Sequence, residues 1–152
     1  MKVKVTQQED FHFIGTSSDF NTELLIDATP RVGGKDRGFR PPFLFLYSMT
    51  AGLSIHLYEY LHEAGKHVEN IETEADWERR SDYPRVFTKT IFRFRLEGRD
   101  LESQDIYNAL EMALNKTCSL AIMLNQTSAI ACEFEVLNTD VKGILEKPAV
   151  QG

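Results

Sequence analysis

Two cysteines, Cys118 and Cys132, are the side chains of this 152-residue chain best suited to redox chemistry. A thiolate attacks peroxides and disulfides, and it forms most readily beside a cation or at the start of a helix. Cys118 stands in Asn-Lys-Thr-Cys-Ser-Leu, where a helical turn can begin, so it is the candidate catalytic thiol. The alternative is that Cys118 is a small side chain retained for packing. Cys132 shares one face of a predicted strand with Phe134 and Val136, so it is expected in the core.

Four further residues are candidates for a binding site. Arg37 and Arg40 lie in a loop rich in glycine and proline, and a guanidinium group holds a carboxylate or peroxide oxygen through paired donors. Their alternative role is that of solvated loop charges. Tyr47 and Met49 follow this loop and are candidates for a pocket wall, with ordinary core packing as their alternative.

Neither a metal site nor a nucleotide site is expected. The side chains of His56, Glu59 and His62 span roughly one third of the circumference of a predicted helix. A metal site usually needs a further ligand from elsewhere, and a solvated helix face explains the three residues. The glycines of residues 33–38 match neither the phosphate-loop nor the dinucleotide pattern. We therefore expect no cofactor.

Composition narrows the class of protein. The chain is 42% hydrophobic and carries a net charge of −6, which disfavours nonspecific binding to nucleic acid or to an acidic membrane surface. No apolar run approaches the roughly 20 residues that span a bilayer. The first residues lack a signal-peptide pattern, and two cysteines are too few for a disulfide scaffold. These features predict a reduced, cytoplasmic protein.

Hydrophobic periodicity predicts an α+β domain over residues 1–137, followed by an irregular tail, residues 138–152. The expected strands are residues 2–6, 10–15, 22–26, 68–73, 85–96 and 127–137. A long loop is expected over residues 27–42 and a charged, turn-rich break over residues 74–84. The expected helices are residues 43–64 and 101–124. The first half of the first helix is so apolar that burial on all sides is expected, at the centre of the domain or of a dimer.

Three motifs in series resemble the OsmC/Ohr family. They are the loop Gly-Gly-Lys-Asp-Arg-Gly-Phe-Arg-Pro at residues 33–41, the strand entrance Tyr-Pro-Arg-Val-Phe-Thr-Lys at residues 83–89, and the segment around Cys118. Gly-Arg-Asp-Leu at residues 98–101 also fits, and the resemblance extends over residues 2–136. It implies an intertwined homodimer with long central helices and sites at the subunit interface.

The resemblance also implies a chemistry that this chain lacks in part. Family peroxidases use a peroxide-attacking cysteine eleven residues after the loop proline, and a second cysteine at the position of Cys118. Counting from Pro41 gives Gly52, and counting from Pro42 gives Leu53. The family's glutamate after the loop proline is also replaced, and the first arginine is Arg31, beyond the N-terminal strands where the family supplies one.

Two functions follow from these residues. The first is a redox or stress-response family member, non-catalytic or of altered chemistry, whose dimer interface binds a small apolar or acidic ligand near Arg37, Arg40, Tyr47, Met49 and Gly52. The alternative is a thiol-dependent organic hydroperoxide reductase in which Cys118 works with an external thiol. The environment of Cys118 discriminates between them. Exposure in a cavity favours the enzyme, whereas packing among Leu114, Leu120 and Met123 favours a structural role.

Overall fold

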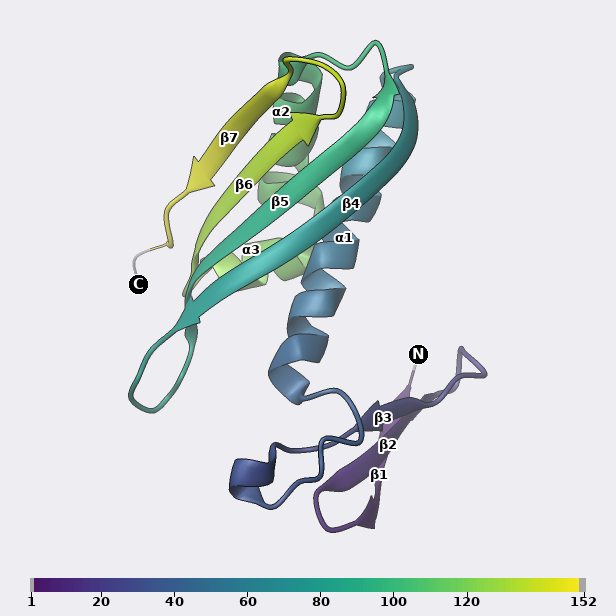
Figure 1. Cartoon of the computed structure of the whole chain (residues 1–152), viewed down its shortest axis with the longest axis vertical. Coiled ribbons are helices and arrows are strands. Elements are labelled where there is room, and N and C mark those ends of the chain that lie inside the picture. Colours follow the sequence, from purple (N-terminus) through teal and green to yellow (C-terminus); the bar gives the residue numbers. More distant parts are fainter. Residues whose placement is uncertain (1, 151–152) are drawn as a thin grey trace. The chain divides into compact units, whose positions relative to one another are not determined.

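The structure is a computed structural model that describes residues 2–150. It divides into two compact units, Met1–Tyr47 and Ser48–Gly152, and each is described by itself. Helix α1, Pro41–Glu63, begins in the first unit and continues in the second (Figure 1). The mixture of helices with two separate sheets confirms the predicted α+β class.

The first unit is built on a small antiparallel sheet in the order β1-β2-β3. Its strands are β1 (Val3–Glu9), β2 (His12–Ser17) and β3 (Leu24–Ile26), which confirms the three predicted N-terminal strands. A 3-10 turn, η1, spans Pro30–Val32. Among the described residues of this unit, only Gly15, Asp27, Gly34 and Leu46 are buried. The unit therefore has almost no apolar core of its own.

Helix α1 follows from a row of apolar residues spaced by three or four. The buried members of this row are Leu46, Met49, Leu53, Leu57 and Leu61. Two prolines open the helix, where no amide hydrogen is needed. Burial on all sides of the first half is not found in the single chain, because Phe43 and Tyr47 are 38% and 58% exposed.

The second unit contains a four-stranded sheet in the order β4-β5-β6-β7, with the helices against one face (Figure 1). Its strands are β4 (His67–Arg79), β5 (Phe87–Arg99), β6 (Ala129–Val136) and β7 (Lys142–Lys147). Strands β5 and β6 are parallel, whereas the other neighbours are antiparallel. Alternate residues of β5 and β6, among them Phe92, Phe94 and Cys132, are buried.

Two predictions about this sheet are corrected. The predicted break at residues 74–84 begins too early, because β4 continues to Arg79 and pairs with β5, with Glu74 opposite Arg93. The predicted irregular tail contains β7, which pairs with β6 from Lys142 opposite Glu135 to Lys147 opposite Ile130. Both segments are polar on one face, and cross-strand pairing supplies the stability that their apolar content does not indicate.

The predicted second long helix is divided into three segments. They are α2 (Ser103–Met112), a π-helical turn η2 (Ala113–Thr117) and α3 (Ser119–Asn125). The interruption falls at Cys118, whose backbone is extended (φ −81°, ψ 94°). The candidate thiol therefore lies at a break in the helix.

Candidate functional site

Gly52 and Cys118 lie side by side in the second unit. A β-carbon placed on Gly52 would be 3.6 Å from the Cys118 Sγ atom and 4.0 Å from a methyl carbon of Leu120. Leu53, the alternative position for the missing family cysteine, is fully buried in the apolar row of α1. The residue of α1 that faces the Cys118 sulfur is therefore Gly52.

Cys118 is only 2% exposed in the single chain. Its amide donates to the carbonyl of Ala113 at 2.9 Å, which closes the π-turn η2, and its side chain makes no capping bond to α3. Leu114, four residues earlier in the chain, is also buried, and a methyl carbon of Leu120 lies near the same β-carbon position of Gly52. Met123 is 64% exposed, so it is not part of the expected apolar surroundings. The burial of Cys118 agrees with the packing role that the sequence left open.

Cys132 lies on β6 and is fully buried. Burial raises the pKa of the Cys132 thiol to about 12, because the charged thiolate cannot be solvated there. The thiol therefore stays protonated and unreactive at neutral pH. This confirms the predicted core position, and both cysteines are free.

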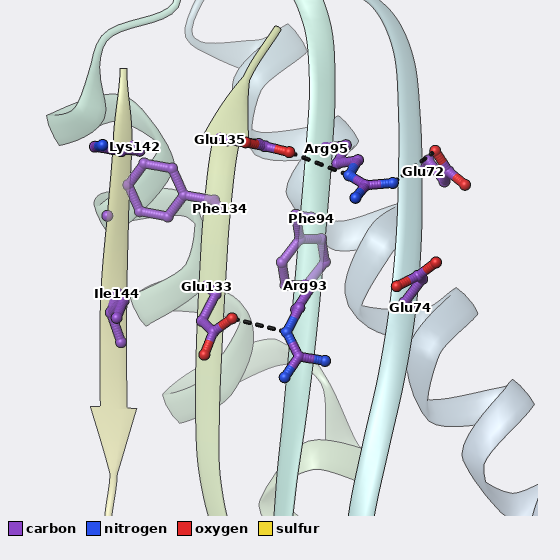
Figure 2. A pocket seen from close by; sticks show the side chains of 11 residues that line it. Glu72, Glu74, Arg93, Phe94, Arg95, Glu133, Phe134, Glu135, Lys142 and Ile144 are labelled. Atoms are coloured by element: carbon purple, nitrogen blue, oxygen red, sulfur yellow. Dashed lines mark hydrogen bonds and ion pairs between the residues drawn. The ribbon is translucent and has the colours of Figure 1, made fainter. Parts of the chain in front are cut away.

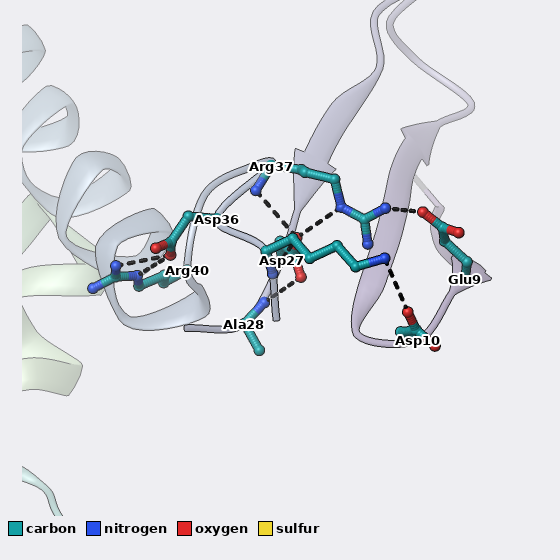
Figure 3. A network of polar contacts seen from close by, with 8 residues as sticks. Glu9, Asp10, Asp27, Ala28, Asp36, Arg37 and Arg40 are labelled. Carbon is teal, nitrogen blue, oxygen red and sulfur yellow. Dashed lines mark hydrogen bonds and ion pairs between the residues drawn. The ribbon is translucent and has the colours of Figure 1, made fainter. Parts of the chain in front are cut away.

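Arg37 is held within a network of polar contacts in the first unit (Figure 3). The carboxylate of Asp27 accepts hydrogen bonds from the amides of Ala28, Lys35 and Arg37, at 2.8, 3.2 and 3.1 Å. The Arg37 Nε atom donates to the same carboxylate at 3.1 Å, and the other end of the guanidinium group pairs with Glu9. The Nε and Nη1 atoms of Arg37 are thus engaged inside the unit, whereas its buried Nη2 atom has no hydrogen-bond partner among the described residues.

Asp27 is the buried centre of this network, with 1% of its surface exposed. Burial by itself opposes ionisation, but the amides of Arg37, Ala28 and Lys35 outweigh it and hold the pKa of Asp27 below its ordinary value. The ionised carboxylate ties residues 27–37 into one fixed loop. A β-carbon on Gly34 would lie 1.9 Å from the Ala28 carbonyl oxygen, so the loop closes only with glycine there.

Arg40 and Tyr47 line one open pocket of about 440 Å³, together with Asp36, Gly38, Phe39 and Phe43. The Arg40 Nη2 atom pairs with Asp36 at 2.8 Å, and its guanidinium carbon lies 6.0 Å from the centre of the Phe43 ring. The Phe39 and Tyr47 rings meet edge to face, with centroids 5.4 Å apart. This pocket has aromatic walls and an arginine whose charge is already balanced.

Two other predicted binding residues, Arg37 and Met49, do not line this pocket. Arg37 belongs to the Asp27 network, and Met49 is fully buried in the core row of α1. Sequence reasoning missed Asp36, Phe39 and Phe43 as lining residues. The aromatic residues on either side of the proline pair were the available signal, since exposed aromatic side chains commonly line ligand pockets.

A second hollow, of about 480 Å³, crosses the outer face of the four-stranded sheet (Figure 2). Arg93 on β5 pairs with Asp76 on β4 and with Glu133 on β6. Arg95, two residues further along β5, pairs with Glu135 on β6 at 3.1 Å and with Glu72 on β4 at 3.9 Å. These side chains satisfy one another across three strands, so the hollow is explained as a stabilising ladder of charges.

The predicted solvated face of α1 carries a local contact. His56 Nδ1 lies 3.3 Å from a carboxylate oxygen of Glu59. Over residues 2–150, no three His, Cys, Asp or Glu side chains are grouped so that they could hold a metal ion. Within the same residues, no helix has both the length and the apolar character needed to cross a membrane.

The family model described as "OsmC-like protein" matches residues 33–133, which include both Gly52 and Cys118. The chain belongs to the OsmC-like protein family. This confirms the resemblance inferred from the loop, the strand entrance and the cysteine segment.

Several known proteins are similar to this OsmC-like chain. Protein YhfA of Escherichia coli K12 is 27% identical over 137 residues, covering 90% of this chain and 98% of YhfA. The crystal structure of an OsmC-like protein from Mycoplasma pneumoniae has a TM-score of 0.74 at 13% identity, covering 90% of this chain and 96% of that one. The organic hydroperoxide resistance protein OhrB of Bacillus subtilis has a TM-score of 0.60 at 17% identity, with 89% and 98% covered. The two structures share the fold of this chain.

Proposed function

We propose that this OsmC-like protein is a redox or stress-response protein without the two-cysteine peroxidase mechanism, acting as a homodimer that binds a small organic ligand. The observation that carries the proposal is the glycine at position 52, directly opposite the Cys118 sulfur. A cysteine at this place would provide the second thiol of a disulfide, and glycine provides none. The free, buried state of both cysteines fits a reduced, cytoplasmic protein.

The missing thiol changes what Cys118 could do. Attack on a hydroperoxide would transfer one oxygen to sulfur, break the O–O bond and release an alcohol, leaving a sulfenic acid. With no neighbouring cysteine, the sulfenic acid would need an external thiol to form a mixed disulfide and water, and a second thiol to restore the free sulfur. The alternative function, a thiol-dependent hydroperoxide reductase, requires this route.

Exposed apolar surfaces support a homodimer. Along α1, Ala51, Ile55 and Tyr58 are exposed, with Ile55 at 65% and Tyr58 at 48%. They follow one another at intervals of three or four residues, so they form one stripe on the helix. An apolar stripe of this kind is expected to be covered by a partner. The first unit has almost no apolar core of its own, which is also expected of a unit that packs against a partner chain.

The pocket around Arg40 and Tyr47 supports the nature of the ligand. Its aromatic walls, Phe39, Phe43 and Tyr47, favour an apolar molecule. An acidic group could bind as well, but it would have to compete with Asp36 for the Arg40 guanidinium group. The structure therefore supports the apolar part of the predicted ligand more strongly than the acidic part.

One assay separates the two functions. Purified protein is mixed with cumene hydroperoxide and a dithiol reductant, and peroxide loss is followed beside Cys118→Ser. The proposed function predicts peroxide loss no faster than with buffer for both proteins. Turnover by the unmodified chain that disappears in Cys118→Ser would replace it with the reductase.

A further inference from the structure

The segment after β6 contacts the helical layer on both sides of Cys118. We name residues 143–150, which comprise most of β7 and the three residues after it, the strap. The strap contacts Tyr107 near the centre of α2, Leu114 in the π-turn η2, and Asn125, the last residue of α3. Cys118 lies between the second and third of these contacts.

The middle contact compensates for the irregular hydrogen bonding of the π-turn. In a regular α-helix the Cys118 amide would donate to the carbonyl of Leu114, four residues earlier. It donates instead to Ala113, five residues earlier, at 2.9 Å. The Lys147 Nζ atom of the strap donates to the Leu114 carbonyl at 3.0 Å, which satisfies the acceptor that the π-turn bypasses.

The two outer contacts hold the strap in place. On α2, the Tyr107 hydroxyl oxygen accepts a hydrogen bond from the Ile144 amide at 3.1 Å. At the end of α3, the Asn125 side-chain amide donates to the Pro148 carbonyl at 2.9 Å, and the Val150 amide donates to the Asn125 carbonyl at 2.9 Å. Asn125 is 1% exposed, so its contact with the exposed Pro148 is partly buried.

We propose that the strap is a conformational latch for the thiol: Lys147 holds the π-turn in place and thereby keeps Cys118 buried. The Cys118 amide has two possible acceptors, Ala113 in the π-turn and Leu114 in a regular helix. A Lys147 ammonium group on the Leu114 carbonyl favours the first arrangement, because it occupies the competing acceptor. Release of the strap allows the turn to reform with a shifted register, which moves the sulfur and opens it to solvent. This inference goes beyond the proposed function and holds for either candidate function.

The latch is tested by the accessibility of Cys118 in the folded full-length chain. Protein is pulsed with iodoacetamide, and the alkylation rates of Cys118 and Cys132 are read by mass spectrometry from chymotryptic peptides, because trypsin leaves both cysteines on residues 117–142. Lys147→Met removes the donor but keeps the length and apolar stem of the side chain. Lys142→Met is the matched control, because Lys142 is an exposed lysine on the same strand. Lys147→Arg restores a cationic donor.

The latch predicts that Lys147→Met raises the Cys118 alkylation rate about tenfold, a change equivalent to about 1.4 kcal/mol in the local opening equilibrium. Lys142→Met and Lys147→Arg should stay close to the unmodified chain, and Cys132 should stay protected in every variant. Equal Cys118 rates in Lys147→Met and Lys142→Met would overturn the proposal. So would a parallel rise at Cys132, since it would indicate global unfolding.

Discussion

The Cys118 sulfur faces the backbone of Gly52, at 3.6 Å from where a β-carbon would stand on that glycine. A sulfur atom bonded to a β-carbon at position 52 could therefore approach the Cys118 sulfur, and a small adjustment would bring the two to the S–S bond length of about 2.0 Å. The geometry of a two-cysteine site is thus retained around one cysteine. In this geometry, a thiol at position 52 is the part of a two-cysteine site that the chain lacks.

Restoring a thiol at this position should therefore restore a disulfide. Gly52→Cys is expected to form a bond with Cys118 under a mild oxidant and to resist unfolding by roughly 2–4 kcal/mol more than its reduced form. Non-reducing peptide mapping would identify the crosslink. Gly52→Cys combined with Cys118→Ser is the control, and three free thiols in the oxidised single variant, in place of the one expected at Cys132, would contradict the geometry.

A smaller change at the same place should stabilise the chain. Glycine inside a helix costs about 0.5–1 kcal/mol relative to alanine, and the β-carbon of Gly52→Ala meets only ordinary contacts. We expect a gain of that size in the free energy of unfolding by urea. Gly34→Ala should do the reverse, because its β-carbon would collide with the Ala28 carbonyl. A loss of stability in Gly52→Ala would show that the space beside the sulfur is smaller than described.

The Asp27 network should make stability depend on pH at the acidic end. The pKa of Asp27 is lower in the folded chain than in the unfolded chain, so folding is favoured by its ionised form. This contribution is fully present above the unfolded pKa, about 3.9, and is lost as the pH falls through the lower folded value. Asp27→Asn should lower the melting temperature at pH 7.

The gap in melting temperature between Asp27→Asn and the unmodified chain should then narrow below about pH 4. Asp10→Asn is the control, since Asp10 is exposed in the same unit and pairs only with the exposed Lys35 in the described contacts. A gap that is constant from pH 7 to pH 3 would exclude ionisation of Asp27 as the source of the effect.

The proposed dimer can be tested with two isoleucines of similar exposure. Ile55 on α1 is 65% exposed and Ile144 on β7 is 57% exposed. If the α1 stripe is the interface, Ile55→Lys buries a charge there and should convert dimer to monomer in size-exclusion chromatography with light scattering. Ile144→Lys should leave the dimer intact. Dissociation by Ile144→Lys alone would move the interface to the outer face of the sheet.

The sequence predicted most elements because their apolar residues follow a simple period. Spacing by four identified α1, and alternation identified β5 and β6, since each buries one continuous face. The extension of β4 and the whole of β7 were missed. The outward residues of the β4 extension are charged, and β5 supplies their partners, since Arg93 pairs with Asp76. Strand β7 lies beside β6, where Lys142 stands opposite Glu135.

The candidate site divides in a similar way. Residue types and motif spacing by themselves determined the family and the absence of a cysteine at positions 52 and 53, because these depend only on which residue stands at which position. Only the tertiary structure decided that Gly52, and not Leu53, faces the sulfur, that Cys118 is buried, and that Arg37 is bound to Asp27. These depend on helix rotation, on a π-turn and on contacts between distant segments, which arise only when the chain packs.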